Sequence, residues 1–554
     1  MRIRSRGFLA CGAAAALAAG VLIRTEAPAA AAGGYPEPRF PKYLRSVTSV
    51  DPLLPPARLA ARQIAGRTPL GLVKSGERLL LVVPDHQDPL VLQAVVRALE
   101  ERGVKVVTAK MSQMQGLTEA QGRQNLQAAQ GHLTFGADGW KEIGAGLLQQ
   151  RLLRFLPADA RAAVTPPRPP NPRTVDDLTG TARYVAAHPE IDRVIYGVGG
   201  RSWQQRAFGP NAAKFLGNWS YEKQSDLLSK VPEFPGDVWK LVEEKVLDAV
   251  PFVESVHMTD PEGTDVRWNV SEDEAAKWTK AAYLQGHIFL YPLQGSRGIL
   301  QAEFDTQVFP DSNGVIAGCA NHTAYFPCAK AYIEHGQITR LEGGGRMGEL
   351  ARILLNAPEL RTVKYPTAPR PGYWYWFEAA LGTNPKYFRP IRELMKGGEG
   401  AINLFERNRS GVFHFGMGLE TLDKAARTFC DDRDLPCDHA WHIHNYFITY
   451  AAKLRDEDTT IDIVDQGHLT SMDNVEVRAL ASRYGDPDLI MREEWIPGMP
   501  GINEPGDYGK DYAPDPWKWI RKEGEAIEAG TYRYLLEGYP TPEGLVRKAS
   551  SPQQ

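Results

Sequence analysis

The stretch Arg78-Leu-Leu-Leu-Val-Val-Pro-Asp85 decides the fold class of the first half of the chain. A continuous apolar run of this length is typical of a strand that is buried on both faces of a parallel sheet. Apolar residues then recur at helical spacing over residues 89–102, Gly103 ends that pattern, and residues 104–109 read as a second buried strand. This order predicts a βαβ unit.

A later apolar run, Asp192-Arg-Val-Ile-Tyr-Gly-Val198, supplies a further strand of the same kind. Residues 78–255 are therefore expected to form an N-terminal α/β domain with parallel strands. The turn at 84–89 contains no glycine that would let a backbone approach a pyrophosphate, so a dinucleotide site is not predicted there. The glycines at 197, 199 and 200 are interpreted as packing residues.

The second half changes character from about residue 256, where alternating strands and glycine turns begin. Strands are expected at 253–258 and 265–270, a hairpin at 333–342 turning at Gly336, and a short helix at 347–355. The overall fold class is therefore α/β: an α/β layer followed by an α+β domain over residues 256–494. Residues 33–77 are expected to form an extended arm, and the aromatic tail 495–554 to wrap the surface and include a helix near 516–530.

The N-terminus carries a targeting pattern. Residues 1–6 are basic, residues 8–23 are apolar, and residues 28–32 are small. That order is typical of a secretory signal peptide, with cleavage after Ala32; an uncleaved membrane anchor is the alternative. We therefore expect a secreted or periplasmic protein with no stable membrane association after cleavage.

Charge argues against nucleic acid as a partner. Removing residues 1–32 takes away four arginines and one glutamate, so the formal net charge of −3 becomes −6. The sequence also shows no basic run or RNA-binding motif. Partners are expected instead to be a peptide or another small-molecule substrate.

Cysteine usage agrees with export. The mature chain would keep Cys319, Cys328, Cys430 and Cys437, an even number in two close pairs. In an oxidising compartment the expected disulfides are Cys319–Cys328 and Cys430–Cys437, with four buried thiols as the alternative. Neither pair has the two-residue spacing that structural zinc sites commonly use.

Histidines gather in one segment, where four of the twelve fall within 31 residues. Residues 441–450 alternate and are aromatic and β-branched, so they are expected to form a strand. Residues two apart on a strand project from the same face, which directs His442 and His444 to one side. His414 lies in a second strand-like segment, 412–418, whereas His439 is expected in a loop. The spacing favours a metal site over hydrogen-bonded core histidines.

Two carboxylates stand among apolar neighbours. Glu378 follows an aromatic run at 373–377, and Glu303 sits within the apolar segment 298–304. Burying such a carboxylate is costly unless it is paired or bound to a metal. Both are candidate metal ligands and candidate general bases. The alternative interpretation is that each is an exposed glutamate at the edge of a strand.

Five segments, taken in chain order, resemble the thermophilic aminopeptidase family, also called M29 or the aminopeptidase T family. They are residues 258–265, 312–316, 333–344, 378–385 and 414–418. The resemblance implies a two-domain fold, a metal site with one or two divalent ions such as zinc or cobalt, and a possible homodimer. It also implies a ligand set, which is Glu303, Glu378, His414, His442 and His444.

Two positions depart from the family pattern. His444 stands where the family has an aspartate of a His-x-Asp pair, and Thr421 stands where it has a tyrosine.

The scaffold also resembles 2,5-dihydroxypyridine dioxygenases, which hold iron(II), and three histidines can hold non-haem iron. The first expectation is an exported aminopeptidase-like hydrolase that uses metal-activated water. An iron(II) ring-cleaving dioxygenase is the alternative, and a non-catalytic binding protein on the same fold is a third class.

Overall fold

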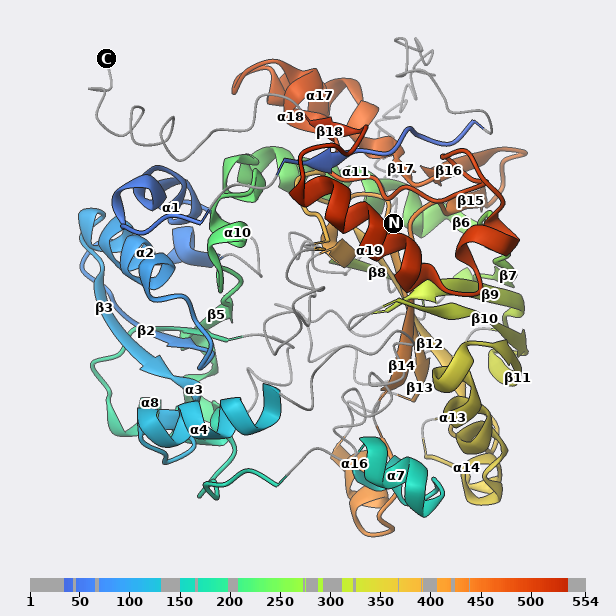
Figure 1. The fold of residues 1–554 in the computed structure, drawn as a ribbon, viewed down its shortest axis with the longest axis horizontal. Coiled ribbons are helices and arrows are strands. Elements are labelled where there is room, and N and C mark those ends of the chain that lie inside the picture. The colour runs from blue at the N-terminus through green and yellow to red at the C-terminus, as the bar shows by residue number, and fades with distance from the viewer. Residues whose placement is uncertain are drawn as a thin grey trace, which may run out of the picture.

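The structure is a computed structural model, and it describes most of the chain between residues 34 and 536. The described ranges are 34–42, 46–64, 69–130, 150–164, 168–197, 208–272, 275, 287–291, 311–321, 325–366, 368–389, 391, 406–419, 424–437 and 439–536. Figure 1 shows a parallel sheet with its helices on the left and a large antiparallel sheet on the right.

The parallel sheet has four strands in the order β3-β2-β4-β5. Its elements are β2 (Arg78–Val83), α2 (Pro89–Glu101), β3 (Lys105–Lys110), α8 (Asp177–Ala187), β4 (Arg193–Tyr196) and β5 (Phe215–Asn218). All three strand pairs are parallel, so the predicted βαβ unit and the later strand are confirmed. Asp88 caps α2, because its side chain accepts hydrogen bonds from the backbone N–H groups of Leu90 and Val91.

Strand β2 is buried on both faces, as its apolar run predicts. Leu79 and Leu81 pack with α1 (Leu54–Ala60) and α2, whereas Leu80 and Val82 face α8. Each face of the sheet thus has its own core. The segment at 33–77 is not wholly extended, because it contributes α1 to one of these cores.

The antiparallel sheet carries most of the second half of the chain, in the order β14-β13-β12-β11-β10-β9-β7-β6-β15-β16-β17, with β8 also paired to β12. Its strands are β6 (Val253–Thr259), β7 (Asp265–Asn269), β8 (His287–Tyr291), β9 (Asn313–Ala320), β10 (Tyr325–Glu334), β11 (Gln337–Gly343), β12 (Tyr375–Gly382), β13 (Phe413–Gly418), β14 (His439–Asn445), β15 (Thr449–Leu454), β16 (Thr460–Asp465) and β17 (His468–Leu469). The predicted hairpin is the β10–β11 pair, which turns at His335 and Gly336.

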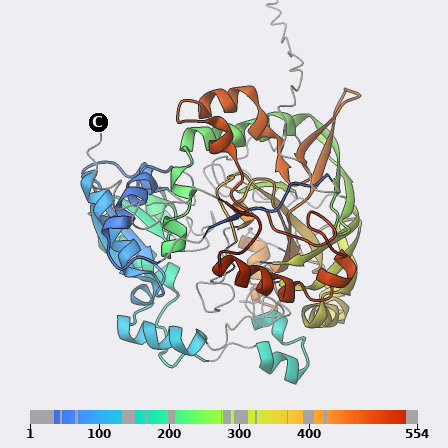
Figure 2. The same cartoon turned by 45° about the horizontal axis from the view of Figure 1, so that its top comes forward.

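One continuous core covers this sheet. It includes helices from both halves of the chain: α7 (Ala158–Val164), α11 (Gly236–Ala249), α13 (Gly345–Asn356) and α17 (Val475–Ala481). The short helix expected at 347–355 is α13. Because α11 packs on the antiparallel sheet, the link between the two halves is a packed helix and not a free linker. Figure 2 shows the blue N-terminal helices on one side and the green to olive strands on the other.

Two further expectations are corrected. Residues 441–450 do not form one strand, because β14 ends at Asn445 and β15 begins at Thr449. His439, expected in a loop, is the first residue of β14. The tail does more than wrap the surface: α19 (Pro516–Glu528) forms as expected, and its residues Trp517 and Ile520 join a core that also contains Phe40.

Candidate metal centre

Three neighbouring strands, β12, β13 and β14, place the predicted ligands side by side. In the antiparallel register Glu378 lies opposite Gly416, and Gly416 lies opposite His442. Two residues further along, His414 lies opposite His444. Residues two apart share a face of a strand, so all of these positions fall on one face. The alternate residues of the same strands, such as Phe415 and Ile443, belong to the hydrophobic core on the other face.

A β-bulge in β12 gives Glu378 its direction. Trp376 pairs with Met417 and Glu378 with Gly416, so two steps along β12 match one step along β13. Met417 and Gly416 point to opposite faces, and Trp376 and Glu378 therefore do so too. Trp376 enters the core, where its ring lies 5.3 Å from that of Trp268 and 5.9 Å from that of Phe415.

The Glu378 carboxylate is the centre of the cluster. Its Oε2 atom lies 3.6 Å from Nε2 of His414 and 3.5 Å from Nε2 of His442. Tetrahedral zinc, with bonds of about 2.0–2.2 Å, sets its ligand atoms roughly 3.3–3.6 Å apart. The three side chains are only 1–3% exposed. The two separations from Glu378 and the chemistry of the three groups fit a tetrahedral dication, which would replace the water that these groups lose on burial.

Gly416 makes room for this carboxylate. A Cβ atom at position 416 would lie 2.5 Å from Cζ of Phe377, and 2.7 Å from Oε2 and 2.9 Å from Cβ of Glu378. Such a contact would force the glutamate to move. Glycine at this register position therefore allows the carboxylate to lie between two imidazoles.

His444 lies beside the cluster and is held from outside it. Its ring centroid is 5.0 Å from that of His414, and its Nδ1 atom hydrogen-bonds the Glu406 carboxylate. Burial lowers the pKa of His444 to about 4, although the charge of Glu406 acts in the opposite direction. His444 is therefore neutral at physiological pH and donates its Nδ1 proton to Glu406. A carboxylate in this position is the usual support for an imidazole that binds a metal through Nε2.

Glu406 is itself fixed by an arginine. Burial would raise the pKa of Glu406, but Arg389 and His444 outweigh it, so the pKa lies below its ordinary value. Nη1 of Arg389 lies 3.3 Å from Oε1 of Glu406 and donates at 3.0 Å to the Tyr446 hydroxyl. Removing either partner of a buried ion pair leaves an uncompensated charge, so Arg389 and Glu406 depend on each other.

Arg407 is the feature that fits a metal least well. Its Nη1 atom lies 3.4 Å from Nδ1 of His414, so the arginine donates to that nitrogen. This contact favours the tautomer of His414 whose Nε2 carries the proton and faces Glu378. Metal binding through Nε2 would need the proton on Nδ1, and the guanidinium would then have to turn away.

The structure brings together four of the five predicted ligands. Glu378, His414 and His442 form a group whose ligand atoms all lie within 4.8 Å of one another, and His444 adjoins it. Glu303 lies outside the described residues. Trp374 and Trp376, from the aromatic run before Glu378, belong to the hydrophobic core.

Sequence reasoning missed the charged residues that support the site, namely Arg389, Glu406 and Arg407. Glu406 and Arg407 lie on a 3-10 turn, Glu406–Asn408, a few residues before β13. A signal was present in the sequence: Glu406-Arg-Asn-Arg409 places three charged residues just before the apolar strand that carries His414. Charges so close to a buried strand are expected to be paired.

Both predicted disulfides are confirmed: Cys319 is bonded to Cys328, and Cys430 to Cys437. Among the described residues a second set of potential ligand atoms comprises Glu262 with Cys319 and Cys328. The disulfide removes this set from consideration as a metal site, because the thiolate is the metal-binding form of cysteine. None of the helices in the described part of the chain is long and apolar enough to span a membrane.

Comparison with known proteins finds distant structural matches only. No model of a known family matches the sequence, and no curated protein does. Among solved structures, 2,5-dihydroxypyridine dioxygenase from Pseudomonas putida matches with a TM-score of 0.38 at 11% identity, covering 76% of this chain and 98% of the other. Wild-type AmpT from Thermus thermophilus matches with a TM-score of 0.35 at 13% identity over the same shares. Membership of the aminopeptidase T family stays a prediction from the sequence motifs.

Proposed function

We propose that the chain is an exported metal-dependent hydrolase that cleaves an amide or peptide bond of an extracellular substrate. One observation carries the proposal: Oε2 of Glu378 lies 3.5–3.6 Å from Nε2 of both His414 and His442 on one buried face of the sheet. Two histidines and a glutamate are the protein ligands of several catalytic zinc sites, which leave a fourth position for water.

Each side chain has a separate role in this proposal. Glu378, His414 and His442 would hold a zinc or cobalt ion, and His444 would support it or bind a second one. When bound, such an ion supplies an acidified water and polarises the substrate carbonyl. The second oxygen of Glu378, or Glu303, would accept the proton of that water as general base. Glu406 is unsuited to this role, because Arg389 and His444 lower its pKa.

A second candidate function follows from the same triad. Two histidines and one carboxylate with open positions also hold iron(II) in non-haem oxygenases. The neutral His444 favours this reading, since it adds no negative charge that would offset a second dication. We rank hydrolysis first, because the ligand separations match tetrahedral zinc more closely than the roughly 3.0 Å edge of an octahedral ion with bonds of about 2.1 Å.

The requirement for oxygen distinguishes the two proposed functions. The purified protein, loaded with zinc or cobalt, is incubated under argon with a library of peptide amides. Cleavage that is lost in Glu378→Gln and kept in His188→Ala, which replaces the histidine that follows α8 beside the parallel sheet, supports hydrolysis. Oxygen uptake by iron(II)-loaded protein with an aromatic diol or hydroxypyridine, together with no cleavage under argon, would overturn it. Neither activity in protein that binds metal would favour the binding-protein class.

A further inference from the structure

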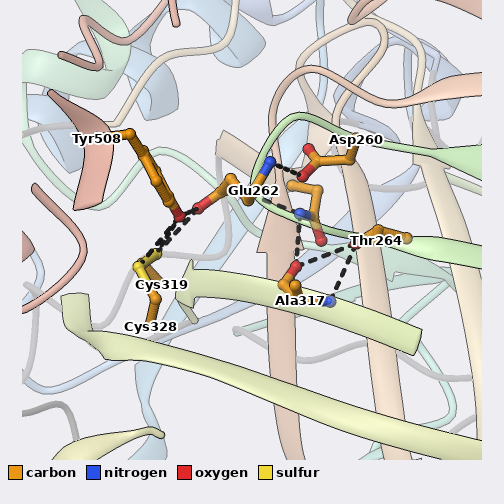
Figure 3. The surroundings of a disulfide bond; sticks show 8 residues. Asp260, Glu262, Thr264, Ala317, Cys319, Cys328 and Tyr508 are labelled. Carbon is orange, nitrogen blue, oxygen red and sulfur yellow. Dashed lines mark hydrogen bonds between the residues drawn. A yellow bond between two sulfur atoms is a disulfide. The ribbon is translucent and has the colours of Figure 1, made fainter. Parts of the chain in front are cut away.

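The Cys319–Cys328 disulfide has acidic and phenolic neighbours. It joins β9 to β10, and Figure 3 shows Glu262 and Tyr508 beside its sulfur atoms. Oε1 of Glu262 lies 3.0 Å from Sγ of Cys319. The Tyr508 hydroxyl lies 3.0 Å from that sulfur, 3.1 Å from Sγ of Cys328 and 3.1 Å from Oε1 of Glu262. A carboxyl group therefore touches Cys319, and a phenolic hydroxyl group touches both sulfurs.

The two cysteine residues differ in exposure. Cys319 is 1% exposed, and Glu262 beside it is 5% exposed, whereas Cys328 is half-buried. An attacking thiolate can therefore reach Cys328 more readily than Cys319. Attack on Cys328 would expel the Cys319 sulfur toward the buried carboxyl group.

We propose that Cys319–Cys328 is a site of thiol–disulfide exchange, in which Glu262 protonates the departing Cys319 sulfur and Tyr508 orients the carboxyl group. This modification site is independent of the proposed hydrolase activity. The co-reactant is a small thiol or a dithiol. The proposal does not extend to the second disulfide, Cys430–Cys437.

The exchange balances with two equivalents of thiol. A thiolate attacks Sγ of Cys328, the bond between the two cysteine sulfurs breaks, and Cys319 leaves as a thiolate that takes the carboxyl proton of Glu262. A second thiolate then attacks the outer sulfur of the mixed disulfide, which releases the oxidised reagent and Cys328. Both electrons come from the reagent. The protons that its two thiols lost restore Glu262 and protonate Cys328.

The environment of Glu262 suits an acid. Burial and the neighbouring Asp260 raise the pKa of Glu262 well above its ordinary value, and burial raises that of Asp260 to about 7. The carboxyl group can therefore hold a proton near neutral pH. Once it is ionised, it can accept hydrogen bonds from Tyr508 and from the Asn445 amide, 3.3 Å away.

Other titratable groups face this turn from the elements packed around it. Burial, followed by the charge of Glu262, raises the pKa of Tyr512 on the C-terminal segment. Burial, followed by the charge of Asp260, raises the pKa of Tyr35 near the N-terminus. Lys330 on β10 passes Gly263, where a Cβ atom would lie 3.4 Å from its Nζ. Both tyrosines titrate above their ordinary range, so the carboxyl pair and the reagent dominate near neutral pH.

The second disulfide is an internal control. Sγ of Cys430 lies 4.0 Å from the main-chain oxygen of Pro436, and Sγ of Cys437 lies 3.6 Å from that of Ala426. Dithiothreitol reduces the folded wild-type protein at a series of pH values, new thiols are alkylated, and peptide mass spectrometry gives a rate for each disulfide. The reagent's own ionisation cancels in the ratio of the two rates.

General acid catalysis makes this ratio depend on pH. We expect the ratio of the Cys319–Cys328 rate to the Cys430–Cys437 rate to fall by about ten-fold or more as pH rises through the pKa of Glu262. In Glu262→Gln the ratio should be low and independent of pH, and Tyr508→Phe should lower it less. Asp265→Asn, an exposed carboxylate at the far end of the same turn, should leave it unchanged. A wild-type ratio that is constant with pH would overturn the proposal, even if Glu262→Gln fails to fold.

Discussion

Gly416 lies directly opposite Glu378 in the sheet, and a Cβ atom at position 416 would come within 2.7 Å of Oε2 of that glutamate. Gly416→Ala is therefore expected to displace the carboxylate from the two imidazoles and to lower zinc affinity about ten-fold or more. Isothermal titration calorimetry with zinc measures the change. Gly509→Ala, where the added atom meets only Oδ1 of Asp507 at 3.4 Å, is the matched control. Equal affinity in both variants would show that Glu378 does not need this space.

Replacing His444 by aspartate, the residue that the aminopeptidase T family has at this position, is expected to destabilise the fold. Its Nδ1 atom hydrogen-bonds the buried carboxylate of Glu406, so His444→Asp would set two carboxylates against each other. An uncompensated buried charge costs about 3 kcal/mol or more, which should appear as a lower midpoint of thermal unfolding. Adding Glu406→Gln removes the repulsion and should recover part of the loss. A single variant as stable as the wild type would contradict this account.

The ion pair between His468 and Glu493 predicts a pH window for stability. Nδ1 of His468 lies 2.9 Å from Glu493, and its Nε2 atom lies 2.8 Å from Asp473. Although burial acts in the opposite direction, Glu493 and Asp473 raise the pKa of His468 from 6.5 to about 10. Burial also opposes ionisation of Glu493, but His468 and the nearby arginines lower its pKa from 4.5 to about 2.

The raised pKa of His468 stabilises the fold fully below pH 6.5, and this contribution is lost as the pH rises toward 10. The lowered pKa of Glu493 stabilises the fold fully above pH 4.5, and this contribution is lost as the pH falls toward 2. The free energy of unfolding by urea should therefore differ most between wild type and His468→Gln at pH values between 4.5 and 6.5. The difference should shrink on both sides. Solvent screens the pair in part, because the His468 side chain is 36% exposed. A difference that grows steadily with pH would count against the pair.

Export predicts a processed N-terminus. Expression of the full chain in a secreting host, followed by intact mass measurement of the secreted protein, should give a mature chain that begins at Gly33, because cleavage is expected after Ala32. An intact Met1 in that material would refute the prediction. Substituting the basic residues Arg4 and Arg6 should retain the precursor inside the cell.

Local patterns predicted much of this fold. The apolar run at β2, the helix after it and the β10–β11 hairpin follow from periodicity and turn residues. The shared face of His442 and His444 likewise follows from the two-residue repeat of a strand. These features depend on neighbours in sequence, which the sequence shows directly.

Features that depend on non-local pairing could not be read in the same way. Strict alternation would put Trp376 and Glu378 on one face, and only the bulge opposite Met417 and Gly416 separates them. The pairing of Glu406 with His444 spans 38 residues and depends on where a short turn packs. The end of β14 at Asn445 was hidden too, because the apolar residues that follow continue the pattern of a strand.

The most direct test of the central claim is the metal content of the folded protein after dialysis against a fixed concentration of zinc. Wild type and His188→Ala, a change beside the parallel sheet, are expected to hold the same amount, at least one ion per chain. Glu378→Gln and His442→Ala are each expected to bind about ten-fold or more weakly, since the first loses the charge of the carboxylate ligand and the second loses an imidazole ligand. If both variants are folded and retain the full zinc content of the wild type, the metal centre at Glu378, His414 and His442 is wrong.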